Sequence, residues 1–451
     1  MIISDIELYR VKIPLAKNKP GFFAEHPYFE PSWIPGFRQS EMRFYLIRLV
    51  TDSGIEGFSA MPCMATERDG LGPLLGNYIL GMNPLDTGLV NQRIQEFAYL
   101  GMRNGWIEAA FWDIIGKAHG KPLYEMLGGN GGIIYPYAST GETHRHDQKI
   151  IAAIVKKRKE EGFRGIKLRV KGTDLNEMID FAGAARHAAG ADMDIMIDAN
   201  QGWPVDILDE TPRWSLKFAA DFAKGIEPFH IKWLEEPLNK GNFKGLADLR
   251  SSTTTPIAGG EMNSSWTEFQ AMLNMGCLDV YQPDAMLIGG TYAGGISVTK
   301  WLIDEIRQRN IAAAPGAKKS KYSPHTWTTG LGFAVGLQLV GLLTPEERSL
   351  VEFPIEGNWR YEHWNRFIKT DLRPRSDGAI KIPAAPGLGV EIDMPVIKKF
   401  GKLVYRGNKK QVALFTLFDR GFKQAMYLKG KKEVQAATAT EATFEIPKAP
   451  F

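Results

Sequence analysis

Three acidic side chains in the centre of the chain, Asp198, Glu235 and Glu261, each stand at the end of a short apolar run. The intervals are 37 residues (235 − 198) and 26 residues (261 − 235), close to the roughly 30 residues that one strand–helix unit of an eight-stranded barrel takes. Three carboxylates that converge at a poorly solvated strand end need a cation to remain ionised. Because an all-oxygen ligand set with positions left for water and substrate suits Mg²⁺, the spacing predicts a magnesium site.

Further polar side chains stand at the ends of neighbouring runs: Lys167, Arg169, Asn200, Asp284, His325 and Glu352. Imidazole is the side chain best suited to proton transfer near neutral pH, so we expect His325 to act as a general base. Asp284, at the end of the preceding run, is expected to accept the other ring N–H and to orient the imidazole. Asn200 is expected to support the metal site or to contact the substrate, because it follows Asp198 by two residues.

The elements that must position these residues begin near Tyr135 and continue to about Pro354. Short apolar runs alternate there with helical patterns, and the runs are 165–170, 195–198, 231–235, 256–261 and 278–284. Repeated strand-then-helix patterning predicts parallel βαβ units. Enough units to close a ring predict an α/β fold of the TIM-barrel type, with active residues at the C-terminal ends of its strands. An open doubly wound sheet is the alternative, but no Gly-x-Gly-x-x-Gly follows an early strand.

The first 130 or so residues read as strands followed by helices, which predicts an α+β domain. Alternating patterns at 3–13 and 44–50 predict strands, and apolar residues at helical spacing in 104–127 predict a helix. The segment 14–40 between the strands is rich in Pro, Gly and aromatic residues. A loop of that length with aromatic residues is either a lid over the site, with Trp33 contacting the substrate, or a packed loop, and the lid is favoured.

These patterns predict four parts of the chain: a capping domain at 1–133, a barrel at 134–355, a return segment at 356–397 and an extension at 398–451. The return segment is expected to pack on the capping domain. The extension is rich in Lys and has short β-like runs at 412–418 and 424–428. A surface extension or an oligomer contact is the expected role, and we expect a homo-oligomer.

The composition is that of an ordinary soluble globular protein, with 44% hydrophobic and 24% charged residues in 451. A net charge of +4 over this length gives no indication of nucleic acid as a partner. The two cysteines, Cys63 and Cys277, form neither a disulfide framework nor a metal-ligand pair, which favours a reducing cytoplasm. No apolar run approaches about 18 residues, so no membrane partner is expected.

Several stretches resemble the ordered signatures of the enolase superfamily, and most closely its mandelate racemase subgroup. They are Gly-Ile-Lys-Leu-Arg at 165–169, Ile-Asp-Ala-Asn at 197–200, Trp-Leu-Glu-Glu-Pro at 233–237, Gly-Glu at 260–261, Gln-Pro-Asp-Ala at 282–285 with Ile-Gly-Gly at 288–290, and Ser-Pro-His-Thr-Trp at 323–327. Trp-Asp-Ile at 112–114, Gly-Lys-Ala at 116–118, Leu-Gly-Gly at 127–129 and Pro-Gly-Leu-Gly-Val at 386–390 add to the resemblance, which covers residues 1 to about 395.

The resemblance implies a capping domain over a modified barrel, with Mg²⁺ held at Asp198, Glu235 and Glu261. In such sites the metal stabilises the enediolate that forms when a base removes the proton α to a substrate carboxylate. Glu352 matches a family position that hydrogen-bonds the substrate carboxylate. The implied partner is therefore a small-molecule carboxylic acid.

Arg169 departs from the subgroup, where a lysine that acts as a base is common at this position. A guanidinium group is effectively never deprotonated, so Arg169 binds or stabilises charge and does not remove a proton. Racemisation with one base on each face of the carbon is thereby disfavoured. One-base dehydration of a sugar acid to a 2-keto-3-deoxy acid is the favoured reaction, with His325 as base and Lys167 as an electrostatic or substrate-binding partner.

Three other functions remain as alternatives: a racemase, epimerase or cycloisomerase of the same superfamily, an aldolase that forms a Schiff base on Lys167, and a non-catalytic binding barrel. An aldolase gives no reason for three carboxylates and a histidine. A binding barrel is expected to lack one of them. A basic insertion at 315–321 lengthens the interval before His325, and it is either a charged loop at the site or a solvated insertion.

Overall fold

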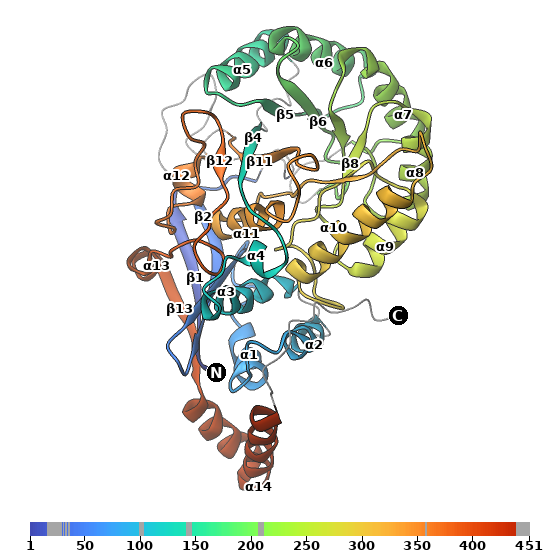
Figure 1. Cartoon of the computed structure of the whole chain (residues 1–451). Helices are drawn as coiled ribbons and strands as arrows, with labels where there is room; N and C mark the ends of the chain where they lie inside the picture. The colour runs from blue at the N-terminus through green and yellow to red at the C-terminus, as the bar shows by residue number, and fades with distance from the viewer. Residues whose placement is uncertain are drawn as a thin grey trace.

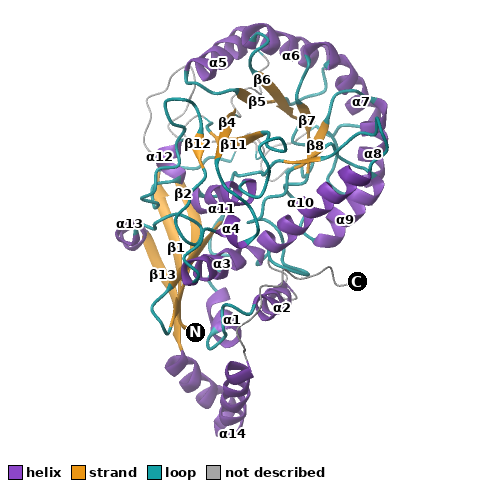
Figure 2. Ribbon diagram, viewed as in Figure 1, coloured by secondary structure: helices purple, strands orange, loops and turns teal. Residues whose placement is uncertain are grey.

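The computed structural model describes residues 1–15, 29, 31, 34, 37–98, 103–140, 147–205, 212–356 and 359–438. They fold around two sheets, one of four strands and one of nine (Figure 1). Figure 2 shows helices around the larger sheet and the smaller sheet to one side of it. Among the described residues, no helix combines the length and the apolar content that crossing a bilayer requires.

The smaller sheet is antiparallel, in the order β13-β1-β2-β3. Its first strands are β1 (Ile3–Pro14), β2 (Glu41–Thr51) and β3 (Glu56–Pro62). The helices that follow are α1 (Leu71–Ile79), α2 (Thr87–Ala98), the short η1 (Gly105–Ile107), α3 (Glu108–Ala118) and α4 (Leu123–Met126). Strands followed by helices confirm the α+β prediction. The helical stretch predicted at 104–127 is interrupted at Gly120, whose φ of 65° a helix interior does not allow.

The larger sheet is a barrel sheet of eight parallel strands in the order β10-β9-β8-β7-β6-β5-β4-β11. They are β4 (Ile133–Ser139), β5 (Gly165–Arg169), β6 (Asp194–Asp198), β7 (Trp233–Glu235), β8 (Ile257–Gly259), β9 (Val280–Tyr281), β10 (Lys321–Tyr322) and β11 (Leu350–Pro354). The connecting helices are α5 (Gln148–Glu160), α6 (Leu175–Ala189), α7 (Leu216–Gly225), η2 (Glu227–Phe229), α8 (Phe243–Ser252), α9 (Trp266–Met275), α10 (Gly295–Ala312) and α11 (Gly330–Val340). This alternation confirms the predicted modified TIM-type barrel.

The interior of the barrel has an apolar floor below the ends of the strands. Its buried side chains are Tyr137, Met196, Trp233, Ala258 and Val280. Because side chains alternate along a strand, a residue two positions further along points into the same interior space. The chain therefore places polar residues directly above this floor, where the strands end.

Two buried carboxylates of α3 join the capping domain to distant parts of the chain. Glu108 accepts hydrogen bonds from the backbone N–H groups of Ile296 (2.8 Å) and Ser297 (3.1 Å), and so caps the N-terminus of α10. Asp113 accepts one from the backbone N–H of Leu388 (3.0 Å) and one from that of Phe58 (3.1 Å). These bonds fix the capping domain against the barrel and against the segment around residue 388.

After β11 the chain leaves the barrel through the short α12 (Tyr361–Trp364), β12 (Ile380–Lys381) and α13 (Met394–Phe400). β12 pairs antiparallel with β4. β13 (Gly401–Asn408) then pairs with β1, and α14 (Lys409–Thr438) follows it. The β-like runs predicted at 412–418 and 424–428 were wrong, because both lie in α14. The many Lys, Leu, Ala and Gln residues there favour a helix more strongly than the few apolar runs favour strands.

The basic insertion at 315–321 immediately precedes β10, so it lies at the N-terminal end of that strand, away from the ends that carry the polar residues. Lys318 donates hydrogen bonds to the backbone oxygens of Arg250 (2.6 Å) and Thr253 (2.8 Å), at the C-terminal end of α8. The interpretation as a charged loop at the site was therefore wrong, and a solvated insertion describes it.

Candidate active site

The C-terminal ends of neighbouring strands bring the predicted residues together. In the sheet register, Arg169 on β5 pairs with Asp198 on β6, and Asp198 pairs with Glu235 on β7. Paired residues of parallel strands point to the same face, so these three side chains share the barrel interior. All three are buried.

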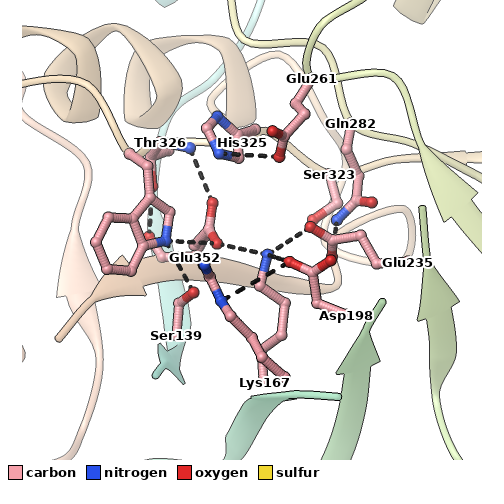
Figure 3. A network of polar contacts seen from close by, with 12 residues as sticks. Ser139, Lys167, Asp198, Glu235, Glu261, Gln282, Ser323, His325, Thr326 and Glu352 are labelled. Atoms are coloured by element: carbon pink, nitrogen blue, oxygen red, sulfur yellow. Dashed lines mark hydrogen bonds and ion pairs between the residues drawn. The ribbon is translucent and has the colours of Figure 1, made fainter. Parts of the chain in front are cut away.

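Lys167 lies at the centre of the carboxylates, as Figure 3 shows. Its Nζ lies 2.8 Å from Oε1 of Glu352 and 3.4 Å from Oδ2 of Asp198, and it also donates a hydrogen bond to Glu235. Burial alone would lower the pKa of Lys167, but Glu235, Glu352 and the other nearby charges raise it well above its usual value. A lysine held as an ammonium ion is neither a base nor a nucleophile. This geometry argues against a Schiff-base aldolase.

Acidic groups outnumber cationic ones at the strand ends. Among the described residues, the carboxyl groups buried there are those of Asp198, Glu235, Glu236, Glu261, Asp284, Glu352 and Glu356. The cationic side chains among them are Lys167, Arg169 and, when protonated, His325. Burial and the neighbouring carboxylates outweigh the opposing effect of Lys167, so the pKa of Glu235 is raised to about 7 and that of Glu236 well above its usual value. The excess of carboxylates is destabilising unless a further positive charge is present.

The residues present fit a divalent cation by their chemistry. Within the described ranges, Oδ2 of Asp198 and both carboxylate oxygens of Glu236 have no hydrogen-bond partner, although all are buried. As the side chains stand, no three His, Cys, Asp or Glu residues in those ranges form a ready-made metal cluster. The carboxylates do not converge on one point, because Glu235 is hydrogen-bonded to Lys167 and Glu261 forms an ion pair with His325. The ligand set of Asp198, Glu235 and Glu261 stays a prediction.

His325 and Asp284 form the dyad that their types suggested. Nδ1 of His325 donates to Oδ2 of Asp284 at 2.9 Å, and Asp284 is itself fixed by the backbone N–H of Met286 at 2.8 Å. Nε2 of His325 lies 3.1 Å from Oε2 of Glu261. Burial alone would lower the pKa of His325, but the charges of Glu261 and Glu352 and the bond to Asp284 raise it to about 10. A divalent cation bound by Glu261 would offset the largest of these charges and so lower the pKa of His325.

Glu352 is fully buried, and both of its oxygens have partners within the protein. Oε1 contacts Lys167 and accepts a hydrogen bond from the indole N–H of Trp327 (3.0 Å), and Oε2 accepts one from the backbone N–H of Thr326 (2.9 Å). The pKa of Glu352 is lowered to about 2, because Lys167 and His325 outweigh the effect of burial. Glu352 thus joins Lys167 to the loop that carries His325. It does not form a surface ion pair, which is the usual role of a single glutamate at a strand end.

Three further side chains hold the proposed metal ligands, and the sequence analysis gave them no role. The indole N–H of Trp203 donates to Oε1 of Glu261 at 2.7 Å. The indole N–H of Trp233 and the amide of Gln282 donate to Oε2 of Glu235 at 3.0 and 2.9 Å. All three residues lie within or beside the motifs that carry the family resemblance. Their position in those motifs is the one sequence signal that could have indicated a role in holding the metal ligands.

A cavity of about 420 Å³ opens above this site and is lined from both domains. The barrel contributes Arg169, Asn200, Glu261 and His325 among other residues. The capping domain contributes a second set: Phe29, Ile34, Gln39, Arg43, Pro62, Cys63, Met64 and Glu67. Part of the predicted lid therefore borders the cavity. Trp33, which was predicted to contact the substrate, lies outside the described residues.

Comparisons with known proteins identify the family. Residues 149–396 match the model described as enolase C-terminal domain-like, and residues 24–128 match the N-terminal domain of mandelate racemase and muconate lactonizing enzyme. The chain is 28% identical over 388 residues to D-galactarolactone cycloisomerase of Agrobacterium fabrum, covering 81% of this chain and 94% of that protein. It is 34% identical over 185 residues to L-talarate/galactarate dehydratase of Salmonella typhimurium, which is 41% of this chain and 44% of that protein.

A racemase from Streptomyces coelicolor with bound magnesium has the same fold, with a TM-score of 0.68, 19% identity, and coverage of 89% of this chain and 100% of that one. The two family models span both the strand-end residues and the helices that cap them. The family resemblance read from the motifs is thus confirmed. The chain belongs to the mandelate racemase and muconate lactonizing enzyme family of enolase-like proteins.

Proposed function

We propose that this protein is a Mg²⁺-dependent hydro-lyase that removes the proton α to the carboxylate of a sugar acid and expels the β-hydroxyl group, giving a 2-keto-3-deoxy acid. The observation that carries the proposal is the His325–Asp284 dyad, in which His325 lines the cavity and lies 3.1 Å from Glu261, one of the buried carboxylates. The dehydratases and cycloisomerases among the relatives support it. The magnesium in the racemase of the same fold supports the choice of metal.

The chain supplies one base on one side of the cavity. His325 removes the α-proton, and Asp284 holds the imidazole so that Nε2 faces the cavity. The protonated ring can then return its proton to the departing hydroxyl group. A divalent cation bound to Asp198, Glu235 and Glu261 would offset the negative charge that develops on the substrate carboxylate.

Arg169 lies where a second base would stand. Its guanidinium lies 5.1 Å from the centre of the Trp327 ring, and its Nε lies 3.9 Å from Oδ2 of Asp198. Burial lowers the pKa of Arg169, but the charges of Glu356 and Asp198 more than compensate, so the group remains a cation. Arg169 lines the cavity and can bind a carboxylate or a hydroxyl group of the substrate, but it cannot accept a proton.

A cycloisomerase is the second candidate. The relative that aligns over 94% of its own length is named D-galactarolactone cycloisomerase. The enolase-type step, removal of a proton α to a carboxylate, would also suit such a reaction. A single histidine base serves it equally well. An epimerase is less favoured, because Arg169 leaves the second face of the carbon without a base.

A screen of sugar acids distinguishes these candidates. The protein is incubated with each acid or its lactone and Mg²⁺, and 2-keto acid is detected with semicarbazide while ¹H NMR follows the starting compound. A dehydratase gives the semicarbazone signal with at least one open-chain acid. Conversion of a lactone without a semicarbazone signal from any open-chain acid would support the cycloisomerase. Exchange of the α-proton for deuterium together with formation of the epimeric acid, and no semicarbazone signal, would contradict dehydration and support the epimerase.

A further inference from the structure

The C-terminal arm, defined here as β13 and α14, lies outside the part of the chain that the family models match. The C-terminal family match ends at residue 396, and β13 begins at residue 401. Figure 1 shows α14 at the far end of β13, beyond the sheet and away from the barrel. The barrel and its cavity are complete without this arm, so the arm is an addition that needs a separate explanation.

The arm is anchored to the capping domain through β13. β13 pairs with β1 from Asp5↔Asn408 to Val11↔Gly401. The ring of Tyr405 lies on α1, where a Cβ at Gly72 would be only 2.2 Å from its Cγ and one at Gly76 only 2.1 Å from its hydroxyl oxygen. The two glycines of α1 therefore make room for the ring.

The described part of α14 exposes large apolar side chains to solvent. They are Leu414, Leu417, Phe418, Phe422, Met426 and Tyr427. Phe418 is 84% exposed, Phe422 68% and Tyr427 62%. With an aromatic side chain taken as about 200 Å², these three rings alone leave roughly 400 Å² of mainly apolar surface in water. A stable interface takes about 800 Å² from each partner, so the arm carries a large share of one. An exposed apolar area of this size on one element is typical of an interaction site.

Charge indicates what covers the patch. Residues 398–451 contain 12 Lys and Arg against 4 Asp and Glu, which leaves 43 against 47 in residues 1–397. The net charge is thus +8 on the C-terminal segment and −4 on the rest of the chain. Two α14 helices packed on each other would repel each other, because both belong to positively charged segments. One α14 packed on residues 1–397 of another molecule would be attracted, because the net charge there is negative.

We propose that α14 docks on residues 1–397 of a second copy of this chain and is a contact of the homo-oligomer. The exposed apolar side chains bury against that copy, and the lysines around them face its excess of acidic groups. Gly421, with φ of 80°, breaks α14 into two segments and sets the angle at which the second segment meets the other copy. The proposal does not depend on which reaction the barrel catalyses.

Sedimentation velocity of the full-length protein over a range of concentrations tests the proposal. Phe418→Ser with Phe422→Ser is expected to weaken self-association at least about tenfold, because exposed aromatic residues dominate such interfaces. Lys423→Glu with Lys429→Glu is expected to weaken it more at about 0.1 M salt than at about 0.5 M, because salt screens the attraction. Ile311→Ser is the matched control, since Ile311 is 85% exposed at the end of α10 and is expected to change nothing. Circular dichroism verifies that each variant is folded.

Three results would overturn the proposal. The first is a wild-type protein that is monomeric at every concentration. The second is an assembly that the Phe418→Ser and Phe422→Ser changes leave intact. The third is a wild-type protein that binds vesicles containing anionic phosphatidylglycerol, in a way that these changes abolish while the assembly persists. That last outcome would identify a lipid surface as the occupant of α14.

Discussion

Lys167 offsets much of the negative charge of the site. Its ammonium group contacts Asp198 and Glu352 and is hydrogen-bonded to Glu235, so it neutralises part of an acidic cluster that would otherwise be unstable. Breaking a buried pair by removing one partner typically costs about 3–5 kcal/mol. We therefore expect the lysine to organise the site rather than to serve as its base.

The indole groups at the site give a prediction at the scale of single residues. Trp203→Phe and Trp233→Phe each remove one hydrogen bond to a proposed metal ligand, Glu261 or Glu235. Each change is expected to weaken Mg²⁺ binding by about 10–100-fold, because groups that orient metal ligands contribute that much to affinity. Isothermal titration calorimetry measures the dissociation constant directly, without any substrate.

Trp214→Phe is the matched control for these variants. Its indole N–H donates to the backbone oxygen of Gly172 at 2.9 Å and does not touch a carboxylate. Its loss should leave the Mg²⁺ dissociation constant unchanged. If all three variants weaken Mg²⁺ binding alike, the effect reflects general destabilisation, and the positioning role is wrong.

The positions of the acids and of the His325–Asp284 pair were predictable from the sequence, because residue type and spacing identify the end of a strand. Asp198 and Glu235 lie in register, and His325 meets Asp284 as expected. The central place of Lys167 and the donation from Trp203 were not predictable. Which atoms meet inside a barrel depends on side-chain directions from several strands, and spacing along one strand does not give them.

Among the elements, α3 and α10 connect the two domains. Glu108 on α3 caps the first turn of α10 over 188 residues of sequence separation, and Asn91 on α2 accepts the backbone N–H of Gly294 at 2.7 Å. The capping-domain residues that line the cavity, among them Arg43 and Glu67, keep their place over the barrel only if the domain has a fixed position. These buried bonds provide that position.

Glu108→Ala tests the connection. The change leaves the backbone N–H groups of Ile296 and Ser297 buried without an acceptor, at a cost of about 1–3 kcal/mol for each such group. The free energy of unfolding, measured with urea, should fall by at least this amount. Glu125→Ala is the control: Glu125 forms an exposed ion pair with Lys121, worth about 1 kcal/mol or less. Equal losses in the two variants would contradict the capping role.

The strand and helix pattern of the barrel was predictable because its periodicity is strong, whereas α14 was not. Short apolar runs such as 412–418 fit a strand and a helix equally well, and the helix-forming residues around them decided the outcome. The bond from Leu388 to Asp113 spans 275 residues, a separation that no local pattern encodes.

For the whole molecule, the excess of buried carboxylates implies that Mg²⁺ stabilises the native state. At a Mg²⁺ concentration about 100 times the dissociation constant, the gain is about 2.7 kcal/mol if the unfolded chain does not bind the ion. The thermal midpoint after treatment with EDTA should therefore rise when Mg²⁺ is added back. Asp198→Asn should remove most of the rise. A thermal midpoint that does not change when Mg²⁺ is added, or a rise of equal size in the Asp198→Asn variant, would contradict the proposed ligand set.

We propose that His325 removes a proton α to a carboxylate in a Mg²⁺-dependent reaction. The most direct measurement is formation of 2-keto acid from the best acid in the screen, with and without Mg²⁺, by wild type and by His325→Asn. We predict turnover only by wild type with Mg²⁺, a loss of at least about 100-fold in the variant, and unchanged Mg²⁺ affinity in that variant. Turnover by His325→Asn at the wild-type rate would contradict the role of His325 as the base. Turnover by wild type after removal of all divalent cations would contradict the requirement for Mg²⁺.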